Sequence, residues 1–203
     1  MDDGATRLDT ATPLQEPGGR SARSILARLL GAFVAVGSLG TLWAASLPGS
    51  AFFVLLPLAL LWLASAGIWI ALVVQDVRRR RPGAVTVLVP LVVIATASLM
   101  LTDVPLQVRF DLSRGAMQHA VDTMPADADM VLEPGLIGTY VIRSMERVDG
   151  GVILAEAIGD SLINDAGFAY LPAGPTPELE NGSFERPQWH DLGGGWWSWT
   201  ASW

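Results

Sequence analysis

The 203-residue sequence contains no cysteine and no lysine, and charged residues make up only 16% of it. Without cysteine the chain can form no disulfide framework, no thiolate zinc site and no cysteine nucleophile. Soluble domains average about 25% charged residues, so a chain this poor in charge must bury its apolar residues unusually well or place them in lipid. All 13 basic residues are arginines, set against 20 acidic residues, and the formal net charge is −7.

The apolar residues are concentrated in three long runs. Charge is almost absent from residues 25–45, 51–74 and 83–102, where Arg28 is the single charged residue. A helix that crosses the roughly 30 Å hydrocarbon core of a bilayer needs about 20 predominantly apolar residues. Each run therefore predicts a transmembrane helix. The expected spans are about residues 25–46, 51–75 and 83–102.

The placement of arginine predicts how these helices are oriented. The first 28 residues and the connection between the second and third runs each hold four arginines, whereas the connection between the first two runs has no charge. Cytoplasmic loops carry the excess of Lys and Arg, so we expect the N-terminus and the arginine-rich connection to be cytoplasmic. The residues that determine this topology are Arg78, Arg79, Arg80 and Arg81.

Three spans would place everything after the third run outside the cell. Residues 103–203 hold five arginines and fifteen Asp or Glu, a net charge of −10, and the remainder of the chain carries +3. We expect a multi-pass protein of the cell membrane in three parts. They are a disordered cytoplasmic tail (1–22), a helical membrane region (23–103) and an extracytoplasmic domain (104–203).

The start of the extracytoplasmic part predicts a strand followed by a helix. Residues 106–112 alternate apolar with polar side chains, which is typical of a half-buried strand. Ser113 is then placed to cap a helix whose apolar residues Met117, Val121 and Met124 follow helical spacing.

The rest of this part predicts antiparallel strands. Residues 136–147 and 152–158 are rich in β-formers and flank Asp149-Gly150-Gly151, a strong hairpin signal. Residues 168–171 predict a further short strand, and residues 196–203 alternate again. The expected fold is three transmembrane α-helices followed by a small α+β domain that is mainly antiparallel β.

Five tryptophans gather near the C-terminal end. The alternation of the last strand directs Trp197 and Trp199 to the domain core, and Ser198 and Thr200 to water or a sheet edge. Core packing is the favoured interpretation, because aromatic side chains dominate small cores. A surface that docks a partner protein, stacks a sugar or contacts the membrane remains open as an alternative. The candidate residues are Trp189, Trp196, Trp197, Trp199 and Trp203.

Several short motifs of this domain resemble a set of uncharacterised actinobacterial envelope proteins. The motifs are Gln107–Arg114, Gly135–Gly138 with Glu146–Val152, Gly167–Pro172 and His190–Trp197. The resemblance covers about half of the chain and implies an actinobacterial envelope protein, without implying any activity. Members of that set carry cysteines in this region, so a disulfide that they share would be absent here.

Sequence motifs for catalysis and metal binding are weak. Gly159-Asp160-Ser161-Leu162 reproduces the signature of the GDSL hydrolases, but Pro187 stands where the carboxylate that orients their histidine would precede His190. Too few residues follow Ser161 for the sheet that those enzymes use. We expect no metal and no cofactor, and the net charge of −10 disfavours nucleic acid.

Together these observations predict a non-enzymatic accessory or protein-interaction component of the cell envelope. The alternative is a sensory domain that binds an envelope glycan, and a serine hydrolase that uses Ser161 comes third. The expected partners are the lipid bilayer and a further membrane or envelope protein. The sequence does not indicate the oligomeric state.

Overall fold

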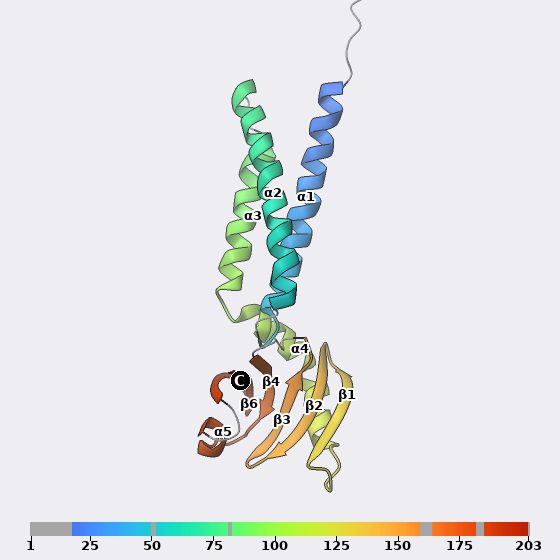
Figure 1. Ribbon diagram of the computed structural model, residues 1–203, viewed down its shortest axis with the longest axis vertical. Coiled ribbons are helices and arrows are strands. Elements are labelled where there is room, and N and C mark those ends of the chain that lie inside the picture. The colour runs from blue at the N-terminus through green and yellow to red at the C-terminus, as the bar shows by residue number, and fades with distance from the viewer. Residues whose placement is uncertain (1–17, 50–51, 81–82, 159–163, 182–184, 203) are drawn as a thin grey trace, which may run out of the picture.

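The computed structural model describes residues 18–49, 52–80, 83–158, 164–181 and 185–202. Three long helices run side by side, and a fourth helix with a six-stranded sheet forms a second body at one end of them (Figure 1). We call this second body, residues 104–202, the sheet domain. Apolar helices are thus followed by a mainly antiparallel α+β domain, as predicted. Most of the predicted N-terminal tail lies outside the described residues, and its last part, residues 18–22, is helical.

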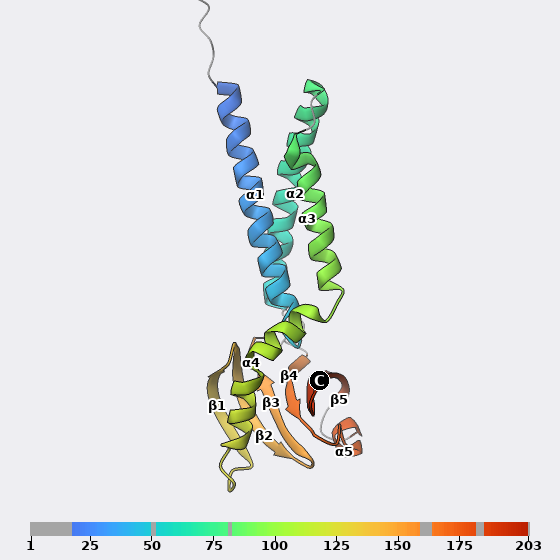
Figure 2. The same ribbon diagram turned by 180° about the vertical axis from the view of Figure 1, so that it is seen from behind.

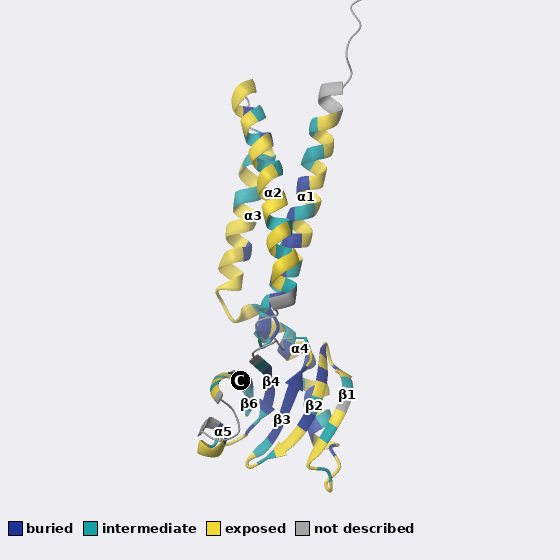
Figure 3. Cartoon of the chain, in the orientation of Figure 1, coloured by how far each residue is buried: buried dark blue, intermediate teal, exposed yellow. Residues whose placement is uncertain are grey.

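The long helices are α1 (Gly18–Ala45), α2 (Phe52–Arg79) and α3 (Ala84–Met100). α1 and α2 are each long and apolar enough to cross a membrane, whereas α3 passes the same test only together with the helix that follows it, from which it is bent by 62°. Their outward faces are almost entirely exposed (Figure 3). Those faces are apolar, since Leu39, Leu63 and Ile94 are each more than 60% exposed. Apolar side chains turned outward along whole helices are typical of surfaces that contact lipid.

Small and hydroxyl-bearing side chains connect the three helices. The Trp62 indole N–H of α2 donates a 3.1 Å hydrogen bond to Thr41 Oγ1 of α1. The Thr96 hydroxyl of α3 lies 3.1 Å from Ser38 Oγ of α1 and also donates to its own helix. Such contacts suit helices that associate without a hydrophobic driving force between them.

The sheet contains six strands in the order β1-β2-β3-β4-β6-β5, and every neighbouring pair is antiparallel. The strands are β1 (Met130–Ile137), β2 (Tyr140–Val148), β3 (Gly151–Glu156), β4 (Asn164–Tyr170), β5 (Glu185–Gly193) and β6 (Trp196–Ser202).

Helices cover both faces of this sheet. α4 (Val104–Asp122) lies across one face, where Phe110 packs in one apolar cluster with Phe168 and Trp196 (Figure 2). The short helix α5 (Pro177–Asn181) contributes Leu179 to a second cluster, which contains Trp199 on the opposite face. The central strands are therefore buried on both sides.

The strand predicted over residues 106–112 is wrong, because these residues form the first half of α4. Leu106 and Phe110 are four positions apart, so a strand and a helix both place them on one face. Met117 and Val121 extend the buried face only at helical spacing. The alternating pattern was therefore compatible with both structures, and packing against the sheet selects the helix.

The helix also begins earlier than predicted. Pro105 lies in its first turn, where a missing backbone N–H costs nothing. Ser113, the predicted N-cap, is instead fully buried in the middle of α4. Its Oγ lies 2.8 Å from Thr139 Oγ1 and accepts a hydrogen bond from the Thr139 backbone N–H.

The hairpin predicted at Asp149-Gly150 is confirmed, since β2 and β3 pair directly across it and Gly150 has a φ of +87°. Residues 136–147 do not form one strand, however. The chain reverses at Gly138, whose φ is +63°, and this turn separates β1 from β2. A Cβ on Gly138 would lie 2.5 Å from Ser113 Cβ, so the turn packs directly on α4.

Candidate functional site

The end of α1 is built into the sheet domain. Leu47, just beyond α1, is 5% exposed and belongs to the apolar cluster that α4 forms with the sheet. The Tyr140 hydroxyl of β2 donates a 3.0 Å hydrogen bond to the Ser46 carbonyl, and Arg109 of α4 donates a 3.0 Å hydrogen bond to Ser46 Oγ. Burial raises the pKa of Tyr140, so its hydroxyl remains a donor. The helices and the sheet domain therefore share one core.

Arg109 connects three elements at this junction. Its guanidinium carbon lies 4.2 Å from the centre of the Tyr140 ring and 5.6 Å from that of Trp43 on α1. Two of its N–H groups also donate to the Thr139 hydroxyl and carbonyl, in the turn between β1 and β2. A single side chain thus ties α1 and α4 to the sheet.

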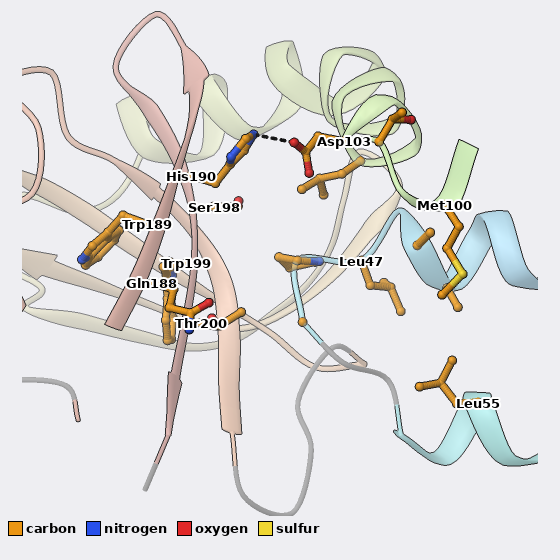
Figure 4. A pocket seen from close by; sticks show the side chains of 16 residues that line it. Leu47, Leu55, Met100, Asp103, Gln188, Trp189, His190, Ser198, Trp199 and Thr200 are labelled. Carbon is orange, nitrogen blue, oxygen red and sulfur yellow. Dashed lines mark ion pairs between the residues drawn. The ribbon is translucent and has the colours of Figure 1, made fainter. Parts of the chain in front are cut away.

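A cleft of about 540 Å³ lies beside this junction. It opens between the α1–α2 connection, the start of α4 and the strands β5 and β6, and we call it the junction cleft (Figure 4). Its helical side is mainly apolar and includes Leu47, Leu55, Met100 and Leu106.

The sheet side of the junction cleft is polar. Gln188 pairs with Thr200, and His190 pairs with Ser198, in the antiparallel register of β5 and β6. Because side chains alternate along a strand, these four residues share one face of the sheet, the face that lines the cleft. The strands therefore supply an amide, an imidazole and two hydroxyl groups opposite an apolar wall.

Asp103, at the start of α4, faces His190 across the cleft (Figure 4). Asp103 Oδ2 lies 3.7 Å from His190 Nε2, and the two side chains are 72% and 48% exposed. This distance exceeds that of a hydrogen bond, so the pair lacks the contact by which a carboxylate orients a catalytic imidazole. Both side chains are largely exposed and offer polar contacts to a ligand.

The cleft thus combines an apolar wall with hydrogen-bonding side chains from both the sheet and the start of α4. That combination suits an amphiphilic molecule, because apolar and polar parts of one ligand would each find a matching side. Among the described residues, no three His, Asp or Glu side chains lie together where they could hold a metal ion.

The structure distributes the predicted tryptophans over two faces of the sheet. Trp196 and Trp199 are 1% and 2% exposed, on opposite faces, whereas Trp189 and Trp197 are partly buried. Each buried indole donates a hydrogen bond, Trp196 to Gln118 Oε1 and Trp199 to the Phe168 carbonyl. These two side chains pack the core and present no surface to a partner. Trp203 lies outside the described residues.

The predicted environment of Ser198 is wrong. Ser198 is 5% exposed and shares the α4 side of the sheet with the fully buried Trp196, because both faces of β6 are covered. The prediction assumed that only one face of this strand would be buried.

The arginine-rich connection lies at the opposite end of the helices from the sheet domain (Figure 1). Near it, Arg23 of α1 forms an ion pair with the buried Asp76 of α2. Asp76 Oδ2 accepts hydrogen bonds from the Gly83 N–H and the Thr86 hydroxyl, both 2.7 Å long. The carboxylate thus joins all three helices. Arg78, Arg79 and Arg80 are described, while Arg81 lies outside the described residues.

No protein-family model, curated protein or solved structure matches this chain. What the protein does must therefore be inferred from its own residues. The Gly159–Leu162 motif with Ser161 lies outside the described residues, so the hydrolase interpretation stays a prediction.

Sequence reasoning missed the residues of the junction cleft. Asp103 and Gln188 were not singled out, and strand β5, which carries Gln188 and His190, was not predicted. Pro187 within β5 is a poor strand signal. No sequence pattern indicates that Asp103 lies beside His190, because 87 positions separate them.

Proposed function

We propose that this protein is a non-enzymatic component of the cell envelope that displays the sheet domain on the outer side of the membrane. α1, α2 and α3 cross the membrane, and the N-terminus and the arginine-rich connection face the cytoplasm. Two observations support this arrangement. The outward helix faces are apolar, and Arg78–Arg80 lie at the end of the helices opposite the sheet domain.

The shared core at the junction is the observation that carries the proposal. A domain on a flexible tether samples many orientations, whereas Leu47, Ser46 and Arg109 hold this domain in one orientation relative to the helices. A fixed orientation suits an accessory component that presents a surface to another membrane or envelope protein. The domain's net charge of −9, from fourteen acidic residues and five arginines, favours a basic or neutral partner surface.

Reporter fusions test the topology. A reporter that is active only in the cytoplasm should be active after Pro82 and inactive after Trp203, and a reporter active only outside should give the reverse. The same signal at both positions would contradict the proposed topology.

Native co-purification from membranes tests the accessory role. Arg109→Ala removes the side chain that ties the domain to α1, and Arg143→Ala removes an arginine that pairs with Asp165 at the domain surface. Both variants are first checked for a normal melting transition. Proteins recovered with the wild type and with Arg143→Ala should be lost or reduced with Arg109→Ala. Equal recovery with Arg109→Ala, or recovery of no protein with the wild type, would contradict the proposal.

The junction cleft favours a second candidate function, the binding of a sugar-bearing lipid. Gln188, Ser198 and Thr200 would contact sugar hydroxyls, and the apolar wall would contact the lipid part. The test measures binding of a diacylglycerol carrying one hexose to the protein in nanodiscs, with the same diacylglycerol lacking the sugar as a control. Thr200→Val should weaken only the sugar-dependent binding, whereas Thr123→Val, far from the cleft, should leave it unchanged. Equal binding of the two lipids would contradict this candidate.

A further inference from the structure

One face of α4 is exposed and apolar although the helix belongs to a folded domain. Val104, Val108 and Leu112 are 51%, 55% and 77% exposed, and Leu101, just before the helix, is 89% exposed. Val104, Val108 and Leu112 follow one another at intervals of four residues, which places them on one stripe of the helix. We call Val104, Val108 and Leu112 the outer stripe. The opposite face is buried against the sheet, so the first half of α4 is apolar on two sides.

The same exposed face becomes polar further along the helix. Beyond Leu112, the positions that continue the outer stripe at helical spacing are Gly115, His119 and Asp122, and all three are exposed. The change is complete within the two turns that follow Leu112. A helix that lay wholly in water would have no reason to change in this way, whereas a helix that leaves a bilayer at an angle passes from an apolar to a polar surrounding.

The outer stripe is also continuous with the apolar ends of the long helices. A shallow groove of about 360 Å³ runs between Leu42 and Trp43 of α1, Leu99 of α3 and the outer stripe, and Arg109 lies at its edge. Trp43 is 40% exposed there. Tryptophan and arginine are the side chains that membrane proteins place where hydrocarbon meets the headgroups.

The bend between α3 and α4 sets the depth of the stripe. From Val104 to Leu112 the helix rises 1.5 Å per residue, which is about 12 Å in total. Because α4 is bent by 62° from α3, only about 6 Å of this rise is directed along α3. If α3 is parallel to the membrane normal, the stripe stays within the boundary layer, about 5–10 Å deep, in which interfacial helices bury their apolar faces.

We propose that the outer stripe of α4 lies in the outer leaflet at the boundary between acyl chains and headgroups. The occupant of this surface is membrane phospholipid, which fills the groove beside Trp43. The sheet domain is thereby held against the bilayer, and the junction cleft lies at headgroup level. This inference rests on the membrane insertion proposed above.

The absence of cysteine from the chain makes a direct test simple, because each introduced cysteine is a unique labelling site. Leu112→Cys labels the outer stripe, His119→Cys labels the same face two turns further on, and Leu60→Cys labels the exposed middle of α2. All three positions are exposed, so the substitutions leave the core unchanged. Each single-cysteine variant of the full chain is labelled with an environment-sensitive fluorophore and placed in nanodiscs of phosphatidylcholine and phosphatidylglycerol. Lipids that carry a nitroxide near the headgroup (shallow) or near the end of the acyl chain (deep) are then used to quench the fluorescence of the label.

We expect the shallow nitroxide to quench the label at Leu112→Cys several-fold more than the label at His119→Cys, and the deep nitroxide to quench Leu60→Cys most strongly. If Leu112→Cys is quenched no more than His119→Cys while Leu60→Cys is still quenched, the inference is wrong and membrane insertion stands. If Leu60→Cys is not quenched, the membrane insertion itself is wrong. A label at Leu112→Cys that is protected from both nitroxide and aqueous iodide would overturn the inference in favour of a protein partner.

Discussion

Replacing Phe110 and Leu112 separately with alanine tests the most consequential difference between sequence and structure. In the strand predicted for residues 106–112, both side chains would point into the core. In α4, Phe110 is fully buried while Leu112 is 77% exposed. The two substitutions should therefore differ sharply in their effect on the stability of the sheet domain.

The magnitude follows from the surroundings of Phe110. Its ring centroid lies 5.4 Å from that of Phe168 and 5.6 Å from that of Trp196. An aromatic residue buries about 150–250 Å², which at about 25 cal/mol per Å² corresponds to about 4–6 kcal/mol. Alanine retains part of that area, so we expect Phe110→Ala to lower the free energy of unfolding by about 3–5 kcal/mol. Leu112→Ala should change it by less than about 0.5 kcal/mol, as exposed positions usually do.

Thermal unfolding of the full-length protein in detergent, followed by tryptophan fluorescence, measures both effects. In a domain of about 100 residues, 1 kcal/mol corresponds to about 4–8 °C in the melting midpoint. Phe110→Ala should therefore lower the midpoint by more than about 10 °C, and Leu112→Ala by less than about 4 °C. Equal, large decreases for the two variants would restore the strand and refute α4 as described.

Three further predictions concern the junction and the sheet. Burial raises the pKa of Tyr140, so its neutral form stabilises the fold below about pH 10, and this contribution is lost as the pH rises further. Melting curves recorded above that pH should therefore show that the wild type loses stability more steeply than Tyr140→Phe. Trp199→Ala should lower the melting midpoint sharply because Trp199 is 2% exposed, whereas Thr200→Ala should change the midpoint little. A normal midpoint for Trp199→Ala would contradict the assignment of Trp199 to the core. Gly138→Ala should also lower the midpoint, because its φ is +63° and its new Cβ would clash with Ser113; an unchanged midpoint would mean that the turn adapts without cost.

Local patterns were enough to predict the elements whose causes are local. The apolar runs predicted the positions of α1, α2 and α3 because the length of an apolar stretch is a property of the chain alone. Asp149-Gly150 predicted the β2–β3 hairpin because Gly adopts a positive φ at little cost. The alternation at residues 196–202 likewise predicted β6.

Other features required the tertiary structure, because two structures satisfied the same pattern. Leu106 and Phe110 fit one face of a strand or of a helix, and the sheet against which they pack made the choice. Ser198 was predicted to face water or a sheet edge, since a sequence cannot indicate that α4 will cover the second face of β6.

The sequence by itself determined that long apolar helices precede an acidic domain rich in antiparallel strands. The length of the apolar runs, the net charge and the alternation of apolar with polar residues are all properties of the sequence alone. Only the tertiary structure decided how that domain is attached and where its cleft lies. The hydrogen bond from Tyr140 to Ser46 joins residues 94 positions apart, and His190 lies opposite Asp103 across the cleft. Contacts between residues that are so far apart in the sequence depend on how whole helices and strands pack, and no local pattern of side chains predicts that packing.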